Sequence, residues 1–101
     1  MSAVVLLHGG TMARRAALSQ SLRATFDAEQ VRVRVSSSAA EAAKCLADSA
    51  MVAVFLIDAP RDASAVRAAA AARGLVKHLY DLEQRDTGEV LTALVREALA
   101  T

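Results

Sequence analysis

Three side chains that can perform acid–base or phosphoryl chemistry lie at or just after the ends of short apolar runs: His8, Asp58 and Asp81. An imidazole can act as a nucleophile, and a carboxylate can accept a phosphoryl group or bind a hard cation. Gly9-Gly10-Thr11 follows His8 and would place free backbone N–H groups at a helix start, which favours an anion. The candidate binding residues are therefore His8, Gly9, Gly10, Thr11, Asp58 and Asp81.

Each of these residues also has a purely structural interpretation. His8 can cap its strand or pair with Asp58, and Asp58 before Pro60 can be an ordinary turn residue that accepts backbone N–H bonds. Two adjacent glycines are a weak phosphate signal, and Thr11 suits a helix N-cap. The residue types alone leave both interpretations open.

Strands and helices alternate along the chain. Continuous apolar runs at 3–8 and 51–57 indicate strands buried on both faces, whereas strict Val/Arg alternation at 31–35 is typical of an edge strand. A less apolar run at 75–80 indicates a fourth strand. Apolar residues at helical spacing predict the intervening helices, at about 12–28, 38–48, 62–72 and 90–99.

Four βα units with short connections predict a single three-layer α/β/α domain spanning residues 1–101, with a parallel sheet of order 2-1-3-4. Ligands of such sheets bind at the carboxyl ends of the strands, at the switch point between strands 1 and 3. His8 and Asp58 end those two strands, so we expect their side chains to be neighbours. Asp81 should lie at the same edge.

Composition excludes several function classes. A net charge of +1 and three aromatic residues argue against a nucleic-acid partner. No apolar stretch reaches the ~20 residues of a membrane span, and the apolar N-terminus lacks the basic lead of a signal peptide. A single cysteine, Cys45, excludes Cys-rich zinc sites. We therefore expect a cytoplasmic protein without a metal or cofactor, and its Arg- and Ala-rich composition is typical of bacteria.

The sequence resembles the receiver domain of bacterial two-component response regulators. Its first strand, the run VRVRVSSSAAEA at 31–42, and its last strand and helix match that family's pattern. The run FLIDAP at 55–60 resembles the third strand and its phosphoacceptor aspartate, here Asp58. The resemblance implies a flavodoxin-like fold and a role in signal transduction.

The chain also departs from the receiver pattern. Receivers hold Mg²⁺ with two acidic residues after the first strand, where this chain has His8 and Gly9. One βα unit is missing, and Tyr80-Asp81 stands where a lysine would end the last strand, with Lys77 earlier. The resemblance then implies a non-enzymatic pseudo-receiver that binds a protein partner, such as a signalling kinase or regulator, without the standard aspartyl phosphorylation.

Three alternatives stay open at this point. Phosphotransferase-system B subunits are similar in length and pattern, and His8 stands where their phosphorylated cysteine would be. An atypical receiver could still be phosphorylated on Asp58. The run LLHGG at 6–10 is similar to the oxyanion stretch of esterases, but the chain has no Gly-x-Ser-x-Gly elbow and is far too short for that fold.

A docking surface is also predicted. The missing unit would leave strand 4 at a sheet edge, and the last helix carries an apolar stripe wider than one sheet contact needs. We expect this surface to mediate partner docking or a homodimer, although the stripe could equally be needed for the core. Its predicted members are Lys77, His78, Val90, Leu91, Leu94 and Val95.

Overall fold

The computed structural model describes residues 2–100; Met1 and Thr101, the two ends of the predicted domain, lie outside the described residues. Four parallel strands form one sheet: β1 (Ala3–Gly9), β2 (Val31–Ser36), β3 (Met51–Ile57) and β4 (Leu79–Leu82). Their order is β2-β1-β3-β4, which confirms the predicted topology. The two continuous apolar runs, β1 and β3, occupy the centre because only central strands are buried on both faces.

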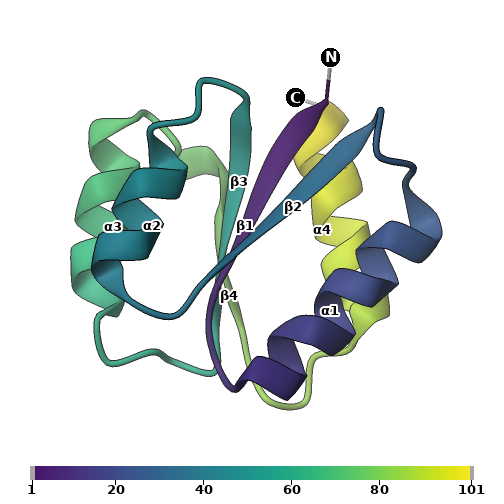
Figure 1. Ribbon diagram of the computed structural model, residues 1–101, viewed down its shortest axis with the longest axis horizontal. Coiled ribbons are helices and arrows are strands. Elements are labelled where there is room, and N and C mark those ends of the chain that lie inside the picture. The colour runs from purple at the N-terminus through teal and green to yellow at the C-terminus, as the bar shows by residue number, and fades with distance from the viewer. Residues whose placement is uncertain (1, 101) are drawn as a thin grey trace.

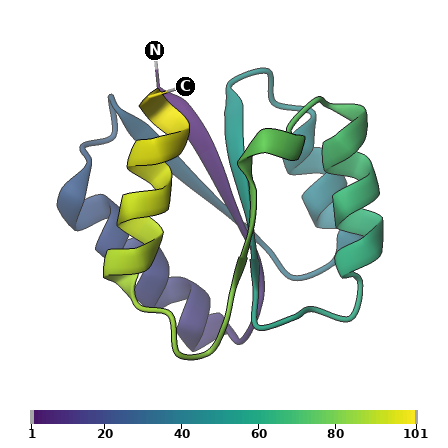
Figure 2. The ribbon, with the colours of Figure 1, turned by 180° about the vertical axis from the view of Figure 1, so that it is seen from behind.

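Helices cover both faces of the sheet (Figure 1). One face carries α1 (Met12–Thr25) and α4 (Gly88–Ala100), and the other carries α2 (Ala39–Leu46) and α3 (Ala63–Ala72). The view from behind shows the same two pairs on either side of the sheet (Figure 2). The result is the three-layer arrangement predicted from the alternating pattern.

Two apolar cores follow from the period-two alternation of β1 and β3. Val5 and Leu7 face α1 and α4, whereas Val4 and Leu6 face α2 and α3. Gly88 lets α1 and α4 approach closely, because a Cβ there would lie 2.2 Å from the hydroxyl oxygen of Ser21. No helix within residues 2–100 is long and apolar enough to cross a membrane.

Local signals set several element ends. The Ser38 hydroxyl accepts a hydrogen bond from the Glu41 N–H at 3.2 Å and begins α2. The Glu41 side chain in turn accepts a hydrogen bond at Oε1 from the backbone N–H of Ser37 at 3.1 Å. This bond is the main reason that the pKa of Glu41 lies below its usual value. Gly74 follows the end of α3 with φ +74°, the left-handed conformation that suits a glycine after a helix.

The fourth strand differs from the prediction. A short 3-10 helix, η1 (Val76–His78), replaces most of the expected strand, and β4 begins only at Leu79. The register explains the shift, because β3 pairs with β4 from Val54↔Leu79 to Ile57↔Leu82. Lys77 and His78 therefore precede the strand instead of lying in it.

Candidate functional site

Asp58 lies at the carboxyl edge of the sheet, directly after β3, and faces α1. Its Oδ2 is 3.5 Å from Nε of Arg14, and the two side chains are only 17% and 21% exposed. Arg14 also donates through a terminal nitrogen to the backbone carbonyl of Glu83 at 2.7 Å. One arginine thus connects α1, the end of β3 and the loop after β4.

The backbone turns sharply at this point. Asp58 has φ +57° and Ala59 φ +48°, two consecutive residues in the left-handed region that non-glycine residues rarely adopt. Such strain persists only where the surrounding structure over-determines it, and it is concentrated at functional sites. Gly10 allows the close packing, because a Cβ there would lie 2.8 Å from Cγ2 of Ile57 and 3.3 Å from Oδ2 of Asp58.

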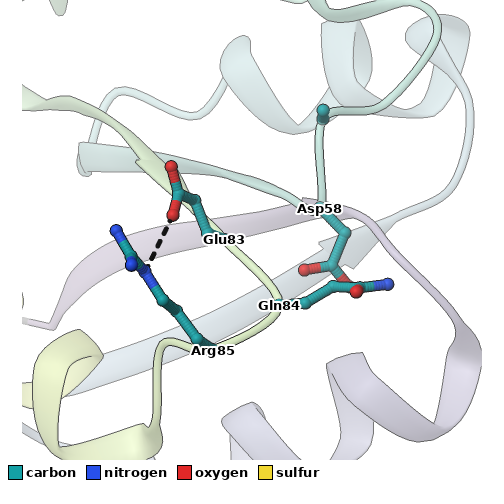
Figure 3. Close-up of a pocket in the computed structure, with 5 residues that line it drawn as sticks. Asp58, Glu83, Gln84 and Arg85 are labelled. Carbon is teal, nitrogen blue, oxygen red and sulfur yellow. Dashed lines mark ion pairs between the residues drawn. The ribbon is translucent and has the colours of Figure 1, made fainter.

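A pocket of about 530 Å³ opens beside Asp58 and is lined by Ala59, Glu83, Gln84 and Arg85 as well. Figure 3 shows Asp58 at the end of β3, and Glu83, Gln84 and Arg85 on the loop that follows β4. On this loop Arg85 forms an ion pair with Glu83 at 3.0 Å. Within residues 2–100, Oδ1 of Asp58 and Nε of Arg14 are buried and have no hydrogen-bond partner. One acceptor of Asp58, which lines this pocket, and one donor of its neighbour Arg14 are therefore both unsatisfied.

His8 does not lie beside Asp58, so that prediction is wrong. It is fully buried on the α2/α3 face, where Nδ1 is 2.7 Å from the hydroxyl of Ser36 and Nε2 is 2.7 Å from Oδ1 of Asp62. An ionised carboxylate can only accept, so Nε2–H donates to Asp62; in the neutral imidazole Nδ1 then accepts from Ser36. The chain Ser36–His8–Asp62 joins the ends of β1 and β2 to the start of α3.

This burial argues against His8 as a phosphoryl carrier. Both ring nitrogens are engaged and the side chain has no solvent-accessible surface. A phosphoryl donor could reach neither nitrogen without opening the fold, because nucleophilic attack requires direct contact.

The hydrogen bond from His8 is the main cause of a lowered pKa at Asp62, whose usual value is 3.8. A lowered folded-state pKa stabilises the protein above the unfolded-state pKa, and this contribution is lost as the pH falls through the folded-state value. We expect the excess stability of the wild type over Asp62→Asn to be constant above about pH 5 and to shrink below pH 3.8. Urea unfolding at several pH values measures it.

Glu29→Gln is the control for that titration, because Glu29 is exposed and its side chain has no hydrogen bond within residues 2–100. Its difference from the wild type should change little over the same pH range. A difference for Asp62→Asn that grows towards low pH would contradict the assigned hydrogen bond.

The other predicted binding residues are only partly brought together. Gly9 and Gly10 lie at the edge near Asp58, as their clash distances to Ile57 and Pro60 show. Thr11 acts as the N-cap of α1, with its hydroxyl accepting from the Arg14 N–H at 3.0 Å. Asp81 was wrongly placed: it lies within β4, is exposed, and forms an ion pair with Arg67 of α3 at 2.5 Å.

The predicted docking stripe on α4 also needs correction. Leu91 and Val95 are fully buried and belong to the core between the sheet and α1/α4, so they form no surface. Leu94 is partly buried against the same core, and Val90 is exposed. Of the six predicted residues, Lys77, Val90 and, in part, His78 and Leu94 reach the surface.

The sequence analysis missed three residues: Arg14, Ser36 and Asp62. Arg14 and the surrounding arginines resemble a solvated helix face, and nothing in their spacing separates Arg14 from Arg15. The contact between His8 and Ser36, however, could have been predicted from the sequence. Ser36 ends the edge strand at the same height as His8, and the register His8↔Ser36 puts the two side chains on one face.

The residues present do not fit the Mg²⁺ site of a receiver. Mg²⁺ requires oxygen ligands, yet Asp58 is paired with a guanidinium, and Gly9 and Gly10 contribute no side chain. His8 faces the opposite side of the sheet. No cluster of three or more His, Cys, Asp or Glu side chains suited to a metal occurs within residues 2–100.

Comparison with known proteins supports the fold. The chain superposes on the crystal structure of a response regulator receiver protein from Sinorhizobium medicae WSM419 with a TM-score of 0.66, covering 99% of this chain and 96% of that one. The two sequences are 19% identical, a level at which the likeness establishes the fold alone. No protein-family model and no curated protein matches the sequence.

Proposed function

We propose that this receiver-fold chain is a signalling module that acts by binding another protein and is not switched by Mg²⁺-dependent phosphorylation of Asp58. The observation that carries the proposal is the contact between Arg14 and Asp58, 3.5 Å between Nε and Oδ2. In an Asp-phosphorylating site that position near the carboxylate belongs to a metal ion, which neutralises the incoming phosphoryl group.

A fixed arginine cannot replace the metal in that step. Phosphoryl transfer requires a cation that bridges the acceptor and the transferred group, together with a second cation that stabilises the product. Arg14 is already held by the backbone carbonyl of Glu83. Lys77 lies in η1, which precedes β4, and therefore at the opposite end of the sheet from Asp58. Asp58 already has a cationic partner within the fold, which supports a role other than phosphoacceptor.

The proposal implies a protein partner, such as a kinase or regulator of a signalling pathway, and a cytoplasmic location in a bacterium. A homodimer is also consistent with it. For self-association we propose the edge of β4 together with the exposed or partly exposed members of the predicted surface, Lys77, His78, Val90 and Leu94. This surface is smaller than the predicted stripe, because Leu91 and Val95 belong to the core.

A ¹H–¹⁵N NMR titration with Mg²⁺, followed by beryllofluoride as a mimic of the aspartyl phosphate, tests the proposal. We expect no specific shifts at Gly9, Gly10 or Asp58, because Arg14 pairs with the Asp58 carboxylate and Glu83, the other carboxylate that lines this pocket, pairs with Arg85. The control is Asp58→Asn, which removes the acceptor and should give the same spectrum changes as the wild type. Shifts clustered on Gly10 and Asp58 in the wild type, but absent in Asp58→Asn, would identify a working phosphorylation site and overturn the proposal.

A further inference from the structure

The edge formed by β2 offers the longer of the two open sides of the sheet. Within residues 2–100, β2 has β1 as its only neighbouring strand and spans six residues, whereas β4 at the other edge spans four. Along an edge strand, alternate N–H and C=O groups point away from the sheet and have no strand to bind. Such a row of groups is a template for an added strand.

A groove runs along β2 on its α1 side. Two hollows, of about 340 and 420 Å³, meet at Arg23 and together follow the strand from Val31 to Ser36. Apolar side chains are left open there: Val35 is 50% exposed and Met12, at the start of α1, is 78% exposed. We call this surface the β2 edge groove; it comprises Met12, Arg23, Arg32, Val33 and Val35 from the two hollows, together with the exposed Arg34 on the opposite face of the same strand.

The groove carries an excess of positive charge, because Arg15, Arg23 and Arg32 line its hollows together with Asp27 and Glu41, and Arg34 adds a further charge on the strand. Residues 12–36 contain five arginines but only two acidic residues, Asp27 and Glu29, although the whole chain has a net charge of +1. Arg23, Arg32 and Arg34 are exposed, and none forms an ion pair or side-chain hydrogen bond within the described part of the chain. This positive charge is therefore available to a partner.

We propose that the β2 edge groove binds an acidic, extended segment of another protein, which adds to the sheet as a strand beside β2. Alternation along β2 places Val33 and Val35 towards α1 and Arg32 and Arg34 towards the other face. An added strand that alternates apolar and acidic side chains would match both faces at once, with backbone hydrogen bonds providing affinity. The inference rests on the proposed function only in taking the chain to be a protein-binding module.

Two other occupants fit less well. A second copy of β2 would bring Arg32 and Arg34 against the same arginines, and like charges directly opposite each other on neighbouring strands are destabilising. Single-stranded nucleic acid could engage the arginines, but the groove exposes no aromatic side chain on which bases could stack, since Phe26 is buried. The open backbone and the apolar Val35 favour a polypeptide.

The test uses two synthetic peptides, acetylated and amidated EVEVEVE and its basic twin KVKVKVK, titrated into the ¹⁵N-labelled chain. We expect the acidic peptide to shift amides of 31–36 and of Met12, to leave 79–82 unchanged, and to bind at least tenfold more weakly at 0.5 M than at 0.05 M salt, because exposed charges are screened. Arg34→Glu should weaken binding at least tenfold. Arg61→Glu, an equal charge change outside the groove, should have little effect.

The outcomes separate this inference from the proposed function. No shift at 31–36, equal binding of both peptides, or tighter binding of an oligothymidine than of the acidic peptide would each overturn the inference. The proposed function fails independently, if beryllofluoride shifts Asp58 as described above. Shifts at 31–36 with the acidic peptide, together with no shift of Asp58 with beryllofluoride, support the inference and the proposed function.

Discussion

Replacing Leu91 with glutamate is expected to abolish the folded state, whereas the same replacement at the neighbouring Val90 leaves it intact. Leu91 is 0% exposed and packs in the core between the sheet and α1/α4, whereas Val90 is 40% exposed. Burying an unpaired carboxylate costs several kcal/mol, and the apolar burial of the leucine side chain is lost as well. A domain of this size has a total stability of about 5–10 kcal/mol, so one such change suffices.

Circular dichroism with urea unfolding measures the difference between the two variants. Val90→Glu should keep a cooperative transition within about 1 kcal/mol of the wild type, as surface substitutions generally do. Light scattering on the same Val90→Glu sample then tests self-association, because that variant stays folded. A folded, monomeric Leu91→Glu protein would show that α4 contributes surface and not core, against the present assignment.

Replacing His8 with alanine is expected to reduce the free energy of unfolding by about 3 kcal/mol, because it removes a buried ring and two hydrogen bonds. Ser36 and Asp62 would both lose their partner. Asp62 stands at the N-cap of α3 without capping the helix through its side chain, so His8 is its principal side-chain contact. Denaturant unfolding at pH 7 gives the magnitude.

The same variant should also loosen the loop that carries Asp58. Asp58 and Ala59 adopt left-handed backbone conformations, each costing about 1–2 kcal/mol, and the bond from His8 to Asp62 holds the far end of that turn. We expect faster amide exchange at 58–62 in His8→Ala and little change at 79–82. Ser36→Ala, which removes one partner and leaves the ring in place, is the matched control and should cost about 1 kcal/mol.

A loss of less than about 1 kcal/mol in His8→Ala would contradict a structural role for the buried imidazole. Unchanged exchange at 58–62 despite a large loss of stability would separate the two effects. His8 would then stabilise the core without positioning the Asp58 loop.

Much of the architecture could be predicted from the sequence because it follows from local patterns. The apolar runs of β1 and β3 are compatible only with central strands, and the Val/Arg alternation of β2 only with an edge. Right-handed crossovers then leave the order 2-1-3-4. The start of α2 could also be predicted locally, because it depends on the hydrogen bond between Ser38 and Glu41, which are three residues apart in the sequence.

The contents of the site were decided by tertiary structure. The carboxyl ends of β1 and β3 do meet, as predicted, but alternation turns His8 towards α2 and α3, and the left-handed turn at Asp58 carries that side chain to the α1 face. Its contact with Arg14 depends on the height at which α1 packs, and the position of Asp62 depends on the loop before α3. Sequence periodicity specifies which face of an element is apolar, but not which polar side chains from distant elements meet above the sheet.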